Sequence, residues 1–264
     1  MLSCADQNEA GVGRGLRASG LKREEVFLTT KLAPSIRGES SVPDPSSFKT
    51  TRMTIESCEA SVGRLGTYAD LYLIHTPFSG RERRLEQWRA CVECQQRGLV
   101  RSIGVSNFGV SHLKEIEASG LPLPAANQLE LHPLAQKPRL LSYMRDKGIA
   151  PIAYSSLAPL STWRRDYATF TGSKGAKDRA TPPLVQGISA RLGVSEARVL
   201  LRYGLQKGWA VLPKSTREER MRENLDLDSF VLSDADMAAL DAMEQDTPLA
   251  FGSDGRAFDP TSVA

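Results

Sequence analysis

Reactive side chains recur where the β-rich runs of this sequence end. Lys31 closes the run EEVFLTTKL, and His75 follows DLYLI. A lysine amine at a partly buried strand end loses hydration, which favours its neutral form and lets it act as a base or attack a carbonyl. A histidine gains or loses a proton near neutrality. The other strand-end residues of this kind are Ser106, Asn107, Gln128, Glu130, Tyr154, Ser155, Lys214 and Ser215.

A second group of residues has the chemistry of a phosphate site. Lys214 and Ser215 end a β-rich run, and Arg220 and Asn224 share one face of the next predicted helix at i, i+4 spacing. Backbone amides at a helix N-terminus favour an anion, and arginine presents a fork that matches phosphate oxygens. The alternative is a solvated, basic helix start that binds nothing.

Short β-rich runs and helical patterns alternate along the chain and position these residues. Strands are expected at 24–32, 70–77, 100–108, 125–131, 149–157 and 209–215. Helices are expected at 8–19, from Ser46 or Ser47 to about 66, at 82–98, 111–119, 136–147, 184–207, 217–225 and 233–244. Ser195 is expected to cap a new helix within 184–207. The polar stretch 158–181 is long for a connection between elements.

Strands separated by helices predict βαβ units and a parallel sheet. A doubly wound sheet fits that alternation, but two observations favour a barrel. Polar residues collect at the strand ends, as in β/α barrels, and no G-x-G-x-x-G follows any strand. Six strands are recognisable, where a closed barrel has eight. The prediction is therefore an incomplete (β/α)8 barrel that forms a single domain over residues 1–264.

The composition is that of an ordinary globular protein and excludes several classes of partner. The net charge of +3, from 34 basic and 31 acidic residues, is too balanced to predict nucleic-acid binding. No apolar run reaches the roughly 18 residues of a membrane span, and the start has no leader pattern. Cys91 and Cys94 lie within a predicted helix with no second pair, so no metal site is expected. A reducing, cytoplasmic setting is the expectation.

Seven motifs occur in order along almost the whole chain. They are NEAGVGRGL, EEVFLTTKL, DLYLIHTP, GLVRSIGVSNF, NQLELHP, IAYSSL and LPKSTREERMRENL, followed by a C-terminal FDPT. In this order the sequence resembles the aldo-keto reductases. The resemblance implies a (β/α)8 barrel that binds NADP(H) and reduces carbonyl compounds to alcohols.

The resemblance also implies cofactor contacts, position by position. It implies contacts to the nicotinamide carboxamide for Ser106, Asn107 and Gln128. It implies a contact to the nicotinamide ring for Tyr154, and contacts to the pyrophosphate path for Ser155 and Leu157. Contacts to the adenosine 2′-phosphate are implied for Lys214, Ser215 and Arg220, and contacts to the adenine for Glu223 and Asn224.

The family's catalytic tetrad consists of Asp, Tyr, Lys and His, and Lys31 and His75 match the last two. The Asp and Tyr belong to a D-T-A-x-x-Y-x-N-E motif. Alignment on Asn8-Glu9 places Asp6 at the Tyr position and Met1 at the Asp position. We therefore expect the first two strands of the family to be missing. The chain is then either a truncated product of a normal reductase or a naturally shortened protein, and both explanations remain open. A homodimer is one way to cover the sheet edges that the missing strands would expose.

Three functions follow from these observations. The leading one is an NADP-dependent reductase of a small carbonyl substrate, of secondary-metabolism or detoxifying type, impaired or repurposed where the Asp and Tyr are absent. The second is a non-redox enzyme that uses Lys31 and His75 for dehydration, isomerisation or cyclisation. The third is an NADPH-binding or structural protein without catalysis.

Overall fold

A computed structural model of the chain describes residues 8–33, 35, 47–160 and 182–245. These residues fall into two compact units, and each is described by itself. The first unit runs to Asn127 and also contains Arg145–Ile149, and the second contains Gln128–Met144 and the residues from Ala150 onward. The expected single domain over 1–264 stays a prediction.

The first unit is built on parallel strands. Strands β1 (Thr29–Leu32), β2 (Ala69–Ile74) and β3 (Val100–Ser106) pair in that order, with Lys31 opposite Leu73 and Ile74 opposite Val105. Every residue of β2 is buried, as is usual for a central strand of a parallel sheet. The six strands of the chain are hydrogen-bonded in chain order, β1 to β6. The α/β class with a parallel sheet is thus confirmed.

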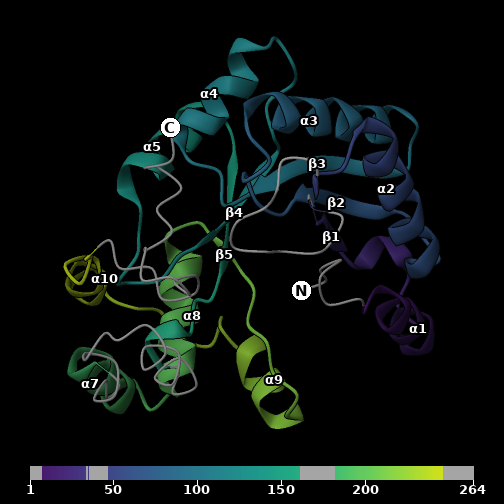
Figure 1. Cartoon of the computed structure of the whole chain (residues 1–264). Coiled ribbons are helices and arrows are strands. Elements are labelled where there is room, and N and C mark those ends of the chain that lie inside the picture. Colours follow the sequence, from purple (N-terminus) through teal and green to yellow (C-terminus); the bar gives the residue numbers. More distant parts are fainter. Residues whose placement is uncertain (1–7, 34, 36–46, 161–181, 246–264) are drawn as a thin grey trace. The chain divides into compact units, whose positions relative to one another are not determined.

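Two helices of the first unit pack against these strands, and two others pack on those helices (Figure 1). The close contact of two of them depends on Gly13, where a Cβ atom would lie 2.2 Å from the carbonyl oxygen of Leu65. Any side chain at this position would force the two helices apart. The helical elements of this unit are α1 (Glu9–Ser19), the 3-10 turn η1 (Arg23–Glu25), α2 (Thr51–Leu65), α3 (Arg81–Gln96) and α4 (Val110–Ala118).

The second unit repeats the same alternation. Strand β4 (Ala126–Glu130) begins in the first unit and continues into the second, where β5 (Ala150–Tyr154) pairs in parallel with β6 (Ala210–Val211). Its helical elements are α5 (Pro138–Asp146), the 3-10 turn η3 (Ala158–Leu160), α7 (Pro183–Leu192), α8 (Glu196–Gln206), α9 (Glu218–Leu225) and α10 (Asp234–Asp241).

All six strands are shorter than the sequence predicts, and β1 and β6 differ most from their predicted ranges. Strand β1 begins at residue 29 instead of 24, because η1 closes on itself through a 2.7 Å hydrogen bond from the Lys22 backbone N–H to the Glu25 carboxylate. Strand β6 covers only two residues of the expected 209–215. Leu212 still donates its N–H to Ala153, but Pro213 has no N–H with which to continue the ladder.

The helix starts also differ from the prediction. Helix α2 begins after Thr50, whose hydroxyl accepts a 3.5 Å hydrogen bond from the backbone of Met53, and not after Ser47; Ser46 lies outside the described residues. Ser195 occupies the N-cap position of α8 as expected, but its side chain makes no capping hydrogen bond. Most of the expected connection 158–181 lies outside the described residues, which include only its first turn, η3.

The described helices are short. The longest, α3, has 16 residues, and none of the helices in the described ranges combines the length and the apolar character that crossing a membrane requires.

Candidate active site

The first unit brings Lys31 and His75 to the same face of its sheet. Lys31 pairs with Leu73, and the backbone N–H of His75 continues the ladder with a 3.0 Å bond to the carbonyl of Leu32. Paired residues of parallel strands point to the same face, and residues two apart on a strand do so too. His75, two residues after Leu73, therefore shares the face of Lys31. We call this face of the sheet the site face.

Ser106 completes this group at the end of β3. Gly104 pairs with Leu73 and therefore lies on the site face, and Ser106 follows it by two residues. A Cβ atom on Gly104 would lie 2.7 Å from the Leu73 side chain and 2.6 Å from the carbonyl oxygen of Ala126. Glycine is therefore required in the layer beneath His75 and Ser106. The residues of the group are buried, Lys31 being 2% and His75 8% exposed.

Asn107 links the ends of β2 and β3 directly. Its side-chain amide donates one hydrogen bond of 3.0 Å to the backbone carbonyl of His75 and another of 3.2 Å to the Ser106 hydroxyl. Its backbone has φ 63°, in the left-handed region that asparagine tolerates better than most residues. The chain thus turns sharply at Asn107, and the side-chain amide of Asn107 contacts the preceding residue, Ser106.

The opposite face of β1 is fixed by a buried carboxylate. Glu9 on α1 has no exposed surface and accepts hydrogen bonds from the hydroxyls of Thr30 and Ser61, at 3.3 and 3.2 Å. The guanidinium group of Arg64 adds bonds of 3.2 and 3.3 Å to the same carboxylate. Because Thr30 precedes Lys31 in β1, this cluster holds the strand from behind the site face.

The loop after His75 is held by a buried ion pair. Arg84 on α3 donates a 2.7 Å hydrogen bond to the carbonyl of Pro77, and it binds both carboxylate oxygens of Glu115 on α4 at 2.8 Å from one nitrogen. The Arg84 side chain is 8% exposed and that of Glu115 is 18% exposed. A single guanidinium group therefore fixes the exit of β2 and joins two helices.

His112 lies inside the unit, on the side of α4 that meets the protein. It is 1% exposed, and its Nδ1 accepts a 3.1 Å hydrogen bond from the backbone N–H of Gly109. Burial, reinforced by the positive charge of Arg84, lowers the pKa of His112 from 6.5 to about 4. His112 is therefore a neutral structural residue that closes the first turn of α4.

In the second unit, the predicted cofactor residues lie at the ends of β5 and β6. Tyr154 is buried as the last residue of β5, and Ser155 after it turns the chain with φ 56°. The carbonyl of Leu157 accepts a 3.0 Å bond within η3. Gln128 and Glu130 are buried on β4, two residues apart, and His132 contacts Glu130 at 3.1 Å. This contact joins the loop after β4 to the end of the strand.

The charges around α9 fall into two classes. Arg217 and Arg222 form ion pairs with Glu219 and Glu218, at 2.6 and 2.7 Å. A hydrogen bond from its own backbone N–H, and then Arg217, lower the pKa of Glu219. Lys214 and Arg220 are exposed and form no ion pair with any residue that the structure describes. Glu218 and Glu219 in the first turn are thus paired with Arg222 and Arg217. Lys214 and Arg220 are the cations that can bind an anion.

The other predicted residues of this group are also accessible. Ser215 is half-buried, and its hydroxyl accepts a 3.1 Å bond from the Arg217 backbone just before α9. Glu223 is exposed and Asn224 half-buried on the last turn of the helix. No residue of α9 is buried, so the position of the helix depends on contacts made by neighbouring residues of the chain.

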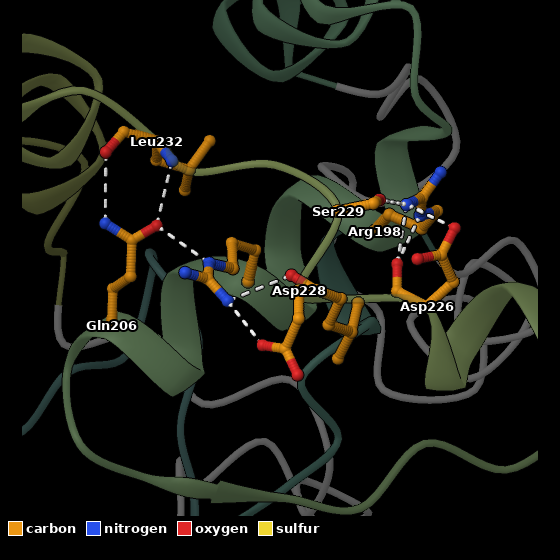
Figure 2. A network of polar contacts seen from close by, with 8 residues as sticks. Arg198, Gln206, Asp226, Asp228, Ser229 and Leu232 are labelled. Atoms are coloured by element: carbon orange, nitrogen blue, oxygen red, sulfur yellow. Dashed lines mark hydrogen bonds and ion pairs between the residues drawn. The ribbon is translucent and has the colours of Figure 1, made fainter.

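Helix α8 supplies that anchor (Figure 2). Arg198 donates to the Asp226 backbone and carboxylate at 2.6 and 2.8 Å, and to the Ser229 hydroxyl at 2.5 Å. Arg202 binds the carbonyl of Leu227 and the carboxylate of Asp228, both at 2.9 Å. The segment that follows α9 is thereby tied to α8.

The cysteines of the C-x-x-C pattern are helix residues, as predicted. Cys91 and Cys94 are free thiols buried on α3, and burial raises the pKa of Cys91 well above its usual range. Within the described ranges, no group of three or more His, Cys, Asp or Glu side chains is arranged to hold a metal ion.

The structure thus brings the predicted residues together in two sets, one in each unit. The first set contains Lys31, His75, Ser106 and Asn107, and Gln128 and the remaining cofactor residues lie in the second unit. The sequence reasoning missed the supporting residues Glu9, Arg84 and Asn127. The two adjacent polar residues that open the run NQLEL were the available signal for Asn127.

Comparison with known proteins decides the family. The aldo/keto reductase family model matches residues 5–245 of the chain. The chain belongs to the aldo/keto reductase family. As a member, it is 38% identical over 259 residues to a morphine 6-dehydrogenase of Pseudomonas putida, an alignment that covers 97% of this chain and 81% of the relative. It is 36% identical to an aldo-keto reductase of Mycolicibacterium vanbaalenii, covering 91% of this chain and 76% of that protein.

Solved aldo/keto reductases share the fold. An enzyme from a deep-sea metagenome library of the Medee basin superimposes with a TM-score of 0.77 at 29% identity, over 94% of this chain and 82% of that one. A Bombyx mori aldo-keto reductase in complex with NADP gives a TM-score of 0.79 at 27% identity, over 96% and 80%. These likenesses confirm the barrel type of fold that the motifs predicted.

Proposed function

We propose that this aldo/keto reductase uses NADP(H) to interconvert a small carbonyl compound and the corresponding alcohol. The observation that carries the proposal is the shared position of Lys31, His75 and Ser106 on the site face, at the ends of three neighbouring strands. The name of the 38% identical relative denotes a dehydrogenase, and a structural neighbour binds NADP. Both agree with a redox reaction.

The residues of the site face fit the carbonyl end of this reaction. Bound NADPH would supply the hydride. As hydride reaches the carbonyl carbon, negative charge develops on the oxygen, and a preorganised donor in a buried site stabilises it. His75 can donate such a hydrogen bond, and the buried Lys31 beside it can add positive charge.

Asn107 fits the carboxamide of the nicotinamide. Its side-chain nitrogen donates to the His75 carbonyl and the Ser106 hydroxyl, and the other polar atom of the amide, Oδ1, is an acceptor. That oxygen accepts hydrogen bonds and suits the NH2 of a carboxamide. We assign Ser106 and Gln128 to the same ligand group by their matching positions in the family.

Lys214 and Arg220 fit the adenosine 2′-phosphate. They are the exposed cations near α9 that pair with no described carboxylate, and Ser215 lies beside them. Arginine and lysine bind phosphate through charge-assisted hydrogen bonds. Glu223 and Asn224 are assigned to the adenine, Ser155 and Leu157 to the pyrophosphate, and Tyr154 to the face of the nicotinamide ring.

We further propose a small carbonyl substrate from secondary metabolism or detoxification, a homodimer, a cytoplasmic location, and altered activity where the tetrad Asp and Tyr are replaced. Met1 and Asp6, which align with those two positions, lie outside the described residues.

A fluorescence titration with NADPH, with NADH as the comparison, tests the proposal. We expect the chain to bind NADPH more tightly, because only NADPH carries the 2′-phosphate. Replacing both Lys214 and Arg220 with alanine should weaken NADPH binding about tenfold or more and leave NADH unchanged. Arg139→Ala, which removes an exposed charge on α5, is the control. A folded chain that binds neither nucleotide would overturn the proposed function.

A further inference from the structure

Asn127 holds the loop that carries Asn107, although nothing in the proposed reaction uses it. Its side-chain amide donates a 2.7 Å hydrogen bond to the carbonyl of Phe108 and accepts one of 3.4 Å from the N–H of the same residue. One side chain thus satisfies both backbone groups of the residue after Asn107. Asn127 and Phe108 are 0% and 1% exposed, so water cannot replace these bonds.

The other end of this short loop is fixed as well. The backbone N–H of Gly109 donates to His112 Nδ1 at 3.1 Å, and the Phe108 and His112 rings meet edge to face at 5.6 Å. Phe108 and Gly109 are therefore held from two sides. Asn107 is the residue between this clamp and the end of β3.

Asn107 needs such support because its conformation is costly. A non-glycine residue at φ 63° lies in a sparsely populated region and persists where its surroundings impose it. That backbone turn directs the Asn107 amide to the His75 carbonyl at 3.0 Å. Releasing Phe108 would let Asn107 relax toward negative φ, and the amide would then move away from His75.

Asn127 acts from outside the ligand site. Successive residues of a strand point to opposite faces, so Asn127 and the predicted cofactor residue Gln128 point in opposite directions from β4. The Asn127 side chain is directed to the Phe108 backbone, and Phe108 connects it to Asn107.

We propose that Asn127 is a positioning residue: by clamping Phe108 it imposes the left-handed turn of Asn107 and thereby sets the contact between Asn107 and His75. The consequence for the nicotinamide rests on the proposed function, whereas the consequence for His75 does not. The two can therefore be tested separately.

The chain contains a matched control for this arrangement. In the second unit, Gln206 holds Leu232 in the same manner, donating to its carbonyl at 3.0 Å and accepting from its N–H at 2.8 Å (Figure 2). Gln206 ends α8, before β6 begins, and therefore lies at the opposite end of that strand from Lys214. Its loss removes these two bonds, together with a 3.1 Å hydrogen bond that Gln206 accepts from Arg202, without touching a predicted site residue.

The first experiment is histidine-selective NMR on Asn127→Leu, Asn127→Asp and Gln206→Leu. The chain has three histidines, so the imidazole signals can be assigned by substitution. In the Asn127 variants the His75 signal should shift, together with that of His112, while His132 stays in place. In Gln206→Leu none of the three should move. Asn127→Asp keeps an acceptor for the Phe108 N–H at nearly the same size and serves if the leucine variant does not fold.

The second experiment compares NADPH with adenosine 2′,5′-bisphosphate, which lacks the nicotinamide. Asn127→Leu should weaken NADPH binding about tenfold and leave the bisphosphate within about twofold. An unmoved His75 signal in a folded Asn127 variant overturns the inference. Equal weakening of both ligands does so too, because the change would then be general. Wild-type protein that binds neither ligand defeats only the proposed function, and the His75 signal still decides the role of Asn127.

Discussion

The Glu9 carboxylate on α1 accepts a 3.3 Å hydrogen bond from the Thr30 hydroxyl on β1, and Glu9 itself has no exposed surface. A buried carboxylate is tolerated where it is paired and hydrogen-bonded, and Ser61 and Arg64 complete its partners. The bond therefore couples the start of α1 to the strand that presents Lys31.

Replacing Glu9 with glutamine should lower the free energy of unfolding by about 2 kcal/mol, because the change removes the charge that these donors surround. Glu56→Gln is the matched control, since Glu56 forms an exposed pair with Arg52 at 3.6 Å and should cost less than about 0.5 kcal/mol. Urea denaturation measures both. Equal costs for the two variants would show that the Glu9 cluster contributes no more than a surface pair.

Replacing Arg84 with methionine should cost about 3 to 5 kcal/mol, because Glu115 would lose its partner in a largely buried place. The loop after His75 would also lose the bond to the Pro77 carbonyl. Arg97→Met, which breaks the exposed ion pair with Glu59, should cost less than about 1 kcal/mol. Thermal or urea unfolding compares them. A small loss for Arg84→Met would indicate that α3 and α4 are held by apolar packing alone.

The protein should lose stability in mild acid because of His112. Its pKa is lowered to about 4 in the folded chain, below the ordinary value of 6.5, so the unfolded chain binds more protons between these pH values. Stability is therefore complete above about pH 6.5 and falls as the pH drops toward 4. From pH 7 to 4.5 this single group should account for a loss of about 2 kcal/mol.

The variant His112→Gln isolates that effect, since glutamine offers an acceptor to Gly109 but does not titrate in this range. Urea unfolding of both proteins at pH 7 and 4.5 gives the difference. The wild type should lose about 2 kcal/mol more than the variant over this interval. Parallel losses in the two proteins would mean that His112 is not kept neutral by its surroundings.

Much of the site was predictable because strand ends are marked in the sequence. Lys31, His75 and Ser106 each end a β-rich run, and parallel strands place such ends along one edge. The contact from Asn107 to His75 was not predictable. It depends on a left-handed turn that Asn127, 20 positions further along the chain, stabilises through Phe108. Such a contact is set by the register of separate strands.

The errors in the fold have similar causes. Ser47 has the chemistry of an N-cap, but α2 begins at Thr51, whose backbone N–H and hydroxyl both donate to Glu86 on α3, at 2.8 and 3.1 Å. The burial of His112 was not predictable either, because helical spacing alone does not show which side of α4 meets the protein. In each case a partner distant in sequence decided the outcome.

Lys31→Met distinguishes a chemical role from an inherited one. If Lys31 takes part in the reaction, the rate of carbonyl turnover should fall at least about a hundredfold, while NADPH binding changes less than about twofold. Lys22→Met, an exposed lysine before η1, is the control. Loss of a cofactor-independent conversion, without loss of hydride transfer, would instead support the non-redox function of Lys31 and His75. An unchanged rate in both assays would remove Lys31 from either mechanism.

Isotope labelling of the cofactor can follow the hydride itself. NADPH carrying deuterium at one or the other C4 position is incubated with the chain and an aromatic aldehyde, and mass spectrometry reads the alcohol. We expect deuterium to reach the carbinol carbon from only one of the two positions, because the buried Tyr154 would cover one face of the ring. An alcohol that lacks deuterium with both labelled cofactors, or no alcohol from a chain that binds NADPH, would contradict the proposal that this aldo/keto reductase transfers hydride.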